Sequence, residues 1–96
     1  MDYDWDERKS VANLRKHRID FRAAKHIFDG PRLEKVDDRR DYGEKRIIAV
    51  GAVDDVVMVV VYTERHQSRR LISARKANDK ERIAYHQALA TNRDSG

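Results

Sequence analysis

In the first third of the chain, apolar residues recur every three or four positions, which is the spacing of an amphipathic helix. Val11 and Leu14 form a narrow apolar stripe in a first helix, for which the carboxylate of Asp6 serves as an N-cap. A second helix is predicted after Asp20 and ends before a Gly-Pro pair, because proline cannot continue the backbone hydrogen-bond ladder. Two short helices therefore open the fold.

The middle of the chain changes to strands that are separated by short polar connections. The expected strands are Tyr3–Trp5 as a short edge strand, then Leu33–Val36, Arg46–Val53, Val56–Thr63 and Arg69–Arg75. Val56–Tyr62 is apolar at every position, as expected for a central strand that is covered on both faces. The pair Asp54-Asp55 suits the two-residue turn of a tight hairpin.

A last helix is predicted from Asn78 to about Ala90, because Asn78 and Glu81 have the spacing of a capping box. The resulting order is β-α-α-β-β-β-β-α, an α+β fold in which helices pack on an antiparallel sheet. We expect one domain over residues 1–90 and a flexible tail over residues 91–96.

The composition excludes several classes of protein. Hydrophobic and charged residues each make up 40% of the 96 residues, which is too apolar for a disordered chain and too charged for a membrane protein. The longest apolar run has seven residues, whereas a membrane-spanning helix needs roughly 20. The first residues lack the pattern of a signal peptide, and the absence of cysteine excludes disulfides and thiolate sites. We therefore expect a cytoplasmic protein with no membrane partner.

The net charge is only +4, but the positive charge is concentrated. Between Arg65 and Lys76 there are five cations and no acid. Regular alternation along this strand would place Arg69, Leu71, Ser73 and Arg75 on one face and Arg70, Ile72 and Ala74 on the other. Guanidinium groups bind phosphate in a bidentate way, so one interpretation is a nucleic-acid surface. The other is a solvated edge strand whose charges prevent aggregation.

The scattered histidines and glycines do not have the spacing of a metal site or a phosphate-binding loop, so no metal and no cofactor are expected. The remaining polar residues suit cleavage of RNA by its own 2′-OH, which needs an acid, a base and cations around the phosphate. The candidates for acid or base are His17, Glu44, Glu64 and His66. The candidates for phosphate binding are Arg46, Arg65, Arg70 and Arg75. Each also has an ordinary structural explanation, such as a charge in a loop or a cation at a helix end.

Three blocks of residues then appear in a fixed order across residues 3–85. The first is an aromatic-Trp-Asp cluster followed by a Lys, an Asn, a Lys-His pair and a Phe, here Trp5, Asp6, Lys9, Asn13, Lys16, His17 and Phe21. The second is the Glu-x-Arg of Glu44 and Arg46. The third contains Thr63, Arg65, Arg70, Ile72, Ser73, Arg75, Ala77, Glu81 and Tyr85. Together these blocks resemble the BrnT family of bacterial type II toxins.

The resemblance implies a RelE-like ribonuclease fold and a toxin that cleaves mRNA without a metal and so inhibits translation. It also implies a BrnA-like antitoxin with a ribbon-helix-helix part. The complex would contact promoter DNA only through the antitoxin and would thereby regulate its own expression. The implied catalytic residues are Arg46, Arg65, Arg70 and Arg75, with Glu44 or His17 as the base. Further contacts to RNA are expected from Lys16, Arg69, Ser73 and Lys76.

Two other interpretations fit the same residues. One is a basic sheet that binds RNA or a protein without cutting it, since no clear acid–base pair stands out. The other is a toxin that has lost its activity and persists as part of a repressor complex. Retained RNA binding without cleavage products would favour the first of these over the active toxin.

Overall fold

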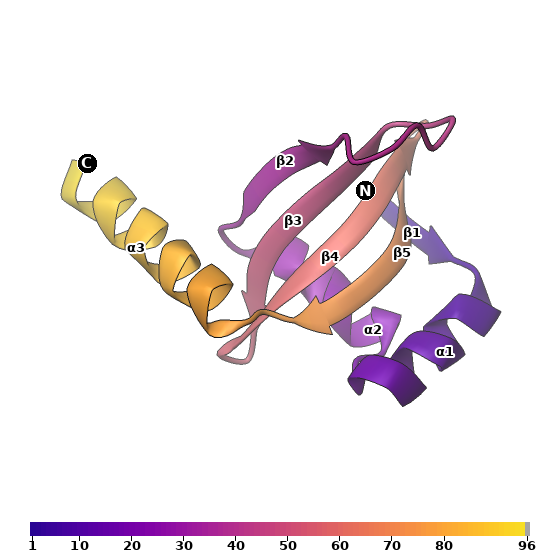
Figure 1. The fold of residues 1–96 in the computed structure, drawn as a ribbon, viewed down its shortest axis with the longest axis horizontal. Coiled ribbons are helices and arrows are strands. Elements are labelled where there is room, and N and C mark those ends of the chain that lie inside the picture. The colour runs from indigo at the N-terminus through magenta and orange to yellow at the C-terminus, as the bar shows by residue number, and fades with distance from the viewer. Residues whose placement is uncertain (96) are drawn as a thin grey trace.

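The computed structural model describes residues 1–95, with side chains up to Thr91 (Figure 1). The elements are β1 (Asp2–Trp5), α1 (Glu7–His17), α2 (Phe21–Ala24), the 3₁₀ helix η1 (Lys25–Asp29), β2 (Leu33–Asp37), β3 (Arg46–Val53), β4 (Val56–Arg65), β5 (Ser68–Lys76) and α3 (Asp79–Ser95). The predicted α+β class and the predicted order of elements are confirmed.

Five strands form one sheet in the order β1-β5-β4-β3-β2. The meander from β2 to β5 is antiparallel as predicted, but β1 pairs with β5 in parallel, so the sheet is mixed. α2 and η1 lie behind the sheet in the view of Figure 1 and α1 lies beside β5, whereas α3 leaves the opposite face at one end. We call the face on the side of α3 the open face.

Local capping explains why the helices begin where the sequence predicts. Asp6 and Asp20 each accept a hydrogen bond from the backbone N–H two residues later, at 2.8 and 2.9 Å. Asn78 and Glu81 form the predicted capping box, in which each side chain accepts from the backbone N–H of the other. α3 continues to Ser95, beyond the predicted end at Ala90, and Gly96 of the predicted tail lies outside the described residues.

The main core lies between the sheet and the first helices. Phe21 and Ile27 are fully buried and pack in one cluster with Val60, Tyr62 and Leu71 of the central strands. Burial of such side chains stabilises the fold by roughly 1.5–3 kcal/mol each. This packing fixes one face of the sheet and leaves the other face for contacts outside the core.

A β-bulge in β5 decides which arginines share a face. Val61 pairs with Ser73 and Tyr62 pairs with Leu71, so Ile72 is an extra residue without a partner on β4. An extra residue inverts the alternation of side chains beyond it. The predicted grouping of Arg69, Leu71, Ser73 and Arg75 on one face is therefore wrong: Arg70, Ser73 and Arg75 share the open face.

Gly51 on β3 is required by close packing against η1. A Cβ at this position would lie 2.8 Å from the Cβ of Ile27, which is buried and cannot retreat. We expect Gly51→Ala to lower the free energy of unfolding by about 1–3 kcal/mol, measured by urea denaturation. Gly30→Ala is the control, because a Cβ there meets nothing within 4 Å. Equal losses in the two variants would contradict this packing.

Candidate active site on the open face

A row of polar residues crosses the open face from one edge of the sheet to the other. The strand register pairs Asp37 with Arg46, Arg46 with Thr63, Thr63 with Arg70, and Arg70 with Asp4. Directly paired residues point to the same face of a sheet, so these five side chains form one line. Arg46 and Arg70 stand on either side of the buried Thr63, with backbones about 10 Å apart across two strand spacings.

Glu44 joins two of the predicted arginines at one end of this row. Its carboxylate accepts from Nη2 of Arg65 at 3.0 Å and from Nε of Arg46 at 3.3 Å. These two guanidinium groups, Arg65 first, hold the pKa of Glu44 below its usual value. The guanidinium of Arg46 also stacks on the ring of Tyr42, at 4.1 Å from its centroid. Glu44 is therefore a carboxylate at neutral pH, held between two cations.

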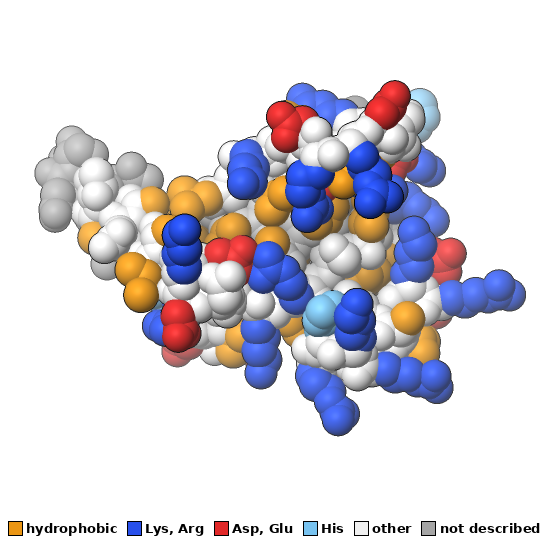
Figure 2. Space-filling view, viewed as in Figure 1, with side chains coloured by type: hydrophobic (Ala, Val, Ile, Leu, Met, Phe, Trp, Pro, Cys, Tyr) orange, Lys and Arg blue, Asp and Glu red, His pale blue; other side chains and the backbone are white. Residues whose placement is uncertain are grey.

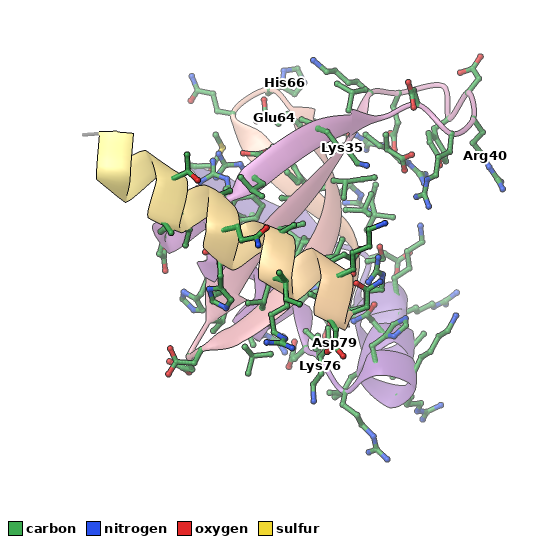
Figure 3. All side chains as sticks on the ribbon, turned by 60° about the vertical axis from the view of Figure 1, so that its left-hand side comes forward. Lys35, Arg40, Glu64, His66, Lys76 and Asp79 are labelled. Carbon is green, nitrogen blue, oxygen red and sulfur yellow. The ribbon has the colours of Figure 1, made fainter. Side chains whose placement is uncertain are left out.

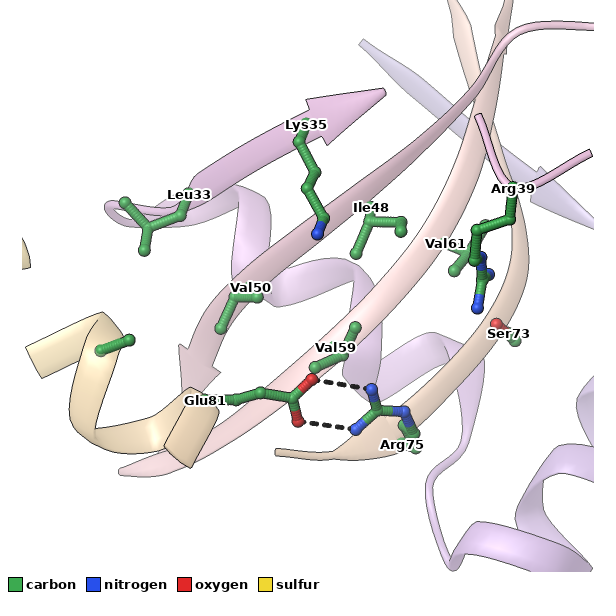
Figure 4. A pocket seen from close by; sticks show the side chains of 11 residues that line it. Leu33, Lys35, Arg39, Ile48, Val50, Val59, Val61, Ser73, Arg75 and Glu81 are labelled. Carbon is green, nitrogen blue, oxygen red and sulfur yellow. Dashed lines mark hydrogen bonds and ion pairs between the residues drawn. The ribbon is translucent and has the colours of Figure 1, made fainter. Parts of the chain in front are cut away.

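Beside the row, the open face is hollowed over β3 and β4 to a volume of about 540 Å³. The floor of the hollow is apolar and consists of Ile48, Val50, Val59 and Val61. Polar and charged side chains around it come from four other segments: Lys35, Arg39, Ser73, Arg75 and Glu81 (Figure 4). Figure 2 shows hydrophobic side chains in the middle of this face, with Lys and Arg side chains around them.

Arg75 forms an ion pair with Glu81 of α3. Both of its Nη groups donate to Glu81 at 2.8 Å, a bidentate pair that Figure 4 shows at the rim of the hollow. The hydrogen bonds from Arg75 lower the pKa of Glu81 to about 2, and the same contact raises the pKa of Arg75. Along β4, the partners of Arg75 and Arg70 are Val59 and Thr63, so Arg75 lies about 13 Å from the row. Ser73 lies between them.

Sequence reasoning missed Arg39 and Asp37. Arg39 reaches back from the loop after β2 and donates to the buried carboxylate of Asp37 through Nε at 2.7 Å and Nη2 at 2.8 Å. Tyr42 adds a third hydrogen bond at 3.1 Å. This contact holds the pKa of Asp37 well below its usual range. Neither of the two stood out in the sequence, because seven of the nine residues 37–45 are charged.

Arg69 lies on the face opposite to the row, which does not support its predicted contact with RNA. Its guanidinium carbon is 4.4 Å from the centroid of Phe28, and Nη1 donates to the hydroxyl of Tyr3 at 3.1 Å. Its side chain is only 13% exposed. The bulge after Leu71 is the reason, since it separates Arg69 from the face of Arg75. Arg69 packs against aromatic rings at the margin of the core.

The other candidates lie around the edge of β5. His17 is the last residue of α1, one helical turn after Asn13, whose amide bonds to the backbone of Ala74. Within residues 1–95 the side chain of His17 makes no hydrogen bond or ion pair with another candidate. Lys16 and Lys76 are exposed at the ends of α1 and β5. The structure thus connects Glu44, Arg46 and Arg65 by direct contacts, places Arg70, Ser73 and Arg75 on the same face, and leaves His17 and the lysines outside.

Over the part of the chain that the structure describes, histidine and acidic side chains do not gather into a group that could hold a metal ion. The same residues include no helix that is long and apolar enough to cross a membrane. A family model described as "Ribonuclease toxin, BrnT, of type II toxin-antitoxin system" matches residues 5–81. A comparison with curated protein sequences gives no match.

Proposed function

Because the chain belongs to the BrnT family of ribonuclease toxins of type II toxin–antitoxin systems, we propose that its open face binds and cleaves RNA. The observation that carries this proposal is the row in which Arg46 and Arg70 stand in register on either side of Thr63. Two fixed guanidinium groups on one rigid sheet suit a phosphodiester, because each offers planar, bidentate donors to phosphate oxygens. Neither group needs to reorganise as negative charge develops on the phosphorus.

In the proposed reaction the ribose 2′-oxygen attacks the adjacent phosphorus, and the bond from phosphorus to the 5′-oxygen of the next nucleotide breaks. The products are a 2′,3′-cyclic phosphate and a free 5′-hydroxyl. Glu44 takes the proton of the 2′-OH, since Arg46 and Arg65 keep this carboxylate ionised beside the row. The leaving 5′-oxygen takes its proton from water, because His17 lies outside the group of contacting candidates. No step requires a metal ion.

The cellular role follows from the family. As a ribonuclease toxin of a type II toxin–antitoxin system, the chain is proposed to act on mRNA in the cytoplasm, to inhibit translation and to be neutralised by an antitoxin. We propose a BrnA-like antitoxin with a ribbon-helix-helix part, so that promoter DNA is contacted through the antitoxin and the complex regulates its own promoter. The net charge of +4 on the toxin favours an acidic segment in that partner.

The direct test is incubation of the purified chain with a single-stranded RNA in the presence of EDTA. We expect fragments that end in 2′,3′-cyclic phosphate, and no cleavage of the same oligonucleotide when 2′-deoxynucleotides replace the ribonucleotides. Because the 2′-oxygen is the nucleophile, cleavage of the deoxy substrate would contradict the mechanism. Salt-sensitive binding of RNA without fragments would instead indicate a non-catalytic module or an inactive toxin.

A further inference from the structure

β2 is an edge strand whose outer side has no partner. It pairs with β3 along Leu33–Asp37 and forms the margin of the sheet in Figure 1. Within residues 1–95 no other strand pairs with its outer side, and no side chain described up to Thr91 bonds to the backbone there. A free row of backbone N–H and C=O groups is a template on which another extended chain can add a strand.

At the opposite margin of the sheet the edge strand is β1, which has four residues. β1 covers only the first part of β5, up to Leu71. Beyond that point the side chain of Asn13 donates to the carbonyl of Ala74 at 2.8 Å and accepts from its N–H at 3.1 Å. This buried amide occupies the place of a neighbouring strand. β2, with five residues, is the longer of the two edge strands. Among side chains described up to Thr91, none bonds to its outer backbone as Asn13 does to that of β5.

The side chains of β2 offer apolar surface to an added strand on both faces. Leu33 is 36% exposed and Val36 is 51% exposed, and successive residues of a strand point to opposite faces. On the open face, Leu33, Ile48 and Val50 line a shallow hollow of about 190 Å³ directly at this margin. An extended segment would therefore gain apolar contacts as well as backbone hydrogen bonds.

The free charge on β2 is positive. Glu34 accepts from Nε of Arg32 at 2.6 Å and from the hydroxyl of Tyr62, and Asp37 is bound by Arg39. Lys35, which Figure 3 labels on this strand, makes no ion pair with the side chains described up to Thr91. Antiparallel pairing of two copies centred on Lys35 would bring two ammonium groups face to face, which is unfavourable. A segment with acidic side chains fits this margin better than a second copy does.

We propose that the free edge of β2 is a docking site for an extended acidic segment of the antitoxin, which adds a sixth strand to the sheet. On the open face the occupant presents an apolar side chain to Leu33 and a carboxylate to Lys35, and on the other face it presents an apolar side chain to Val36. The inference rests on the proposed function only in that the partner is an antitoxin. A strand added here lies beside the hollow, at the Asp37 end of the row and two strand positions from Arg46. Docking and RNA cleavage are therefore separable by mutation.

The test uses the protein encoded beside this gene as the antitoxin, titrated onto two matched variants of the full chain. Val36→Glu places a charge on the free edge of β2, whereas Val11→Glu makes the same change at a valine of α1 that is 46% exposed. Loss of one buried valine contact predicts that Val36→Glu weakens antitoxin binding by roughly tenfold to a hundredfold. Val11→Glu is expected to bind like the unmodified chain, and both variants are expected to retain cleavage of RNA.

Hydrogen exchange on the unmodified complex provides a second readout that requires no variant. Amides of residues 33–37 are expected to exchange more slowly in the complex than in the free chain. Equal binding by the two variants, or absence of binding, would overturn the proposal, as would unchanged exchange at β2. Loss of self-association in Val36→Glu, measured by ultracentrifugation without antitoxin, would assign the edge to a second copy. Antitoxin binding is measured without RNA. The binding result therefore tests the docking site even if the chain cleaves no RNA.

Discussion

Arg70→Ala is expected to reduce the rate of RNA cleavage by about 10²–10³-fold. Arg70 lies on the open face, half-buried, with its guanidinium held by Asp4 at 3.1 Å, so its position is fixed before RNA binds. Removing one preorganised donor to the transition state costs this much in other enzymes that stabilise an oxyanion. The measurement is the single-turnover rate at saturating protein on a fluorescent RNA oligonucleotide.

Arg22→Ala is the matched control for Arg70→Ala. Arg22 belongs to α2 on the far side of the sheet and its side chain is 65% exposed, so its removal changes the net charge equally without touching the row. We expect full cleavage from this variant. A similar loss in both variants would mean that net charge, and not the arginine row, governs the reaction. Thermal unfolding of both proteins checks that the fold is intact.

Glu44→Gln is expected to lower the rate of cleavage by about 10²–10⁴-fold, the range for removal of a general base. Gln retains the shape of the side chain but cannot accept the 2′-OH proton. Glu64→Gln is the matched control, because Glu64 pairs in register with Arg69 on the other face of the sheet. The two variants lose the same charge within one region of the protein. Equal rates for the two would remove Glu44 from the mechanism.

The pH dependence distinguishes Glu44 from a histidine base. The guanidinium groups of Arg65 and Arg46 lower the pKa of Glu44 from its usual 4.5, so the base is ionised above that value and becomes protonated only as the pH falls below it. The fall in kcat/KM that reports protonation of the base should therefore occur below pH 4.5, and kcat/KM should show no such fall near neutral pH. A histidine base gives a limb near pH 6.5. A limb there that disappears in His17→Asn would assign the base to His17.

The helices and the hairpin were predictable because their signals are local. Asp6 and Asp20 cap the backbone two residues away, and the turn residues Asp54 and Asp55 adopt the left-handed φ values of 49° and 68° that a tight hairpin needs. Each of these features depends on a few neighbouring residues and is therefore visible in the sequence. The parallel pairing of β1 with β5 joins residues 66 positions apart and has no local signal.

The residue types of the candidate site follow from the resemblance, whereas its geometry could not be predicted from the sequence. The resemblance implied Glu44, Arg46 and Arg65, and the structure joins these three by hydrogen bonds. The bulge at Ile72 was not predictable, because one unpaired residue leaves no mark in the pattern of apolar positions. Because of that single residue, Arg70 shares a face with Arg75, whereas regular alternation predicted Arg69 in this position. A face assignment based on alternation alone therefore fails in this strand.

The most direct test of the arginine row is NMR of the chain with bound 2′-deoxy-substituted RNA, which has no nucleophile and is not cleaved. The side-chain Nε–H resonances of Arg46 and Arg70 are predicted to shift on binding, together with the backbone amide of Ser73. The Nε–H of Arg69, on the opposite face, is predicted to stay in place. Shifts at Arg69 with none at Arg46 and Arg70 would contradict an RNA site on the open face.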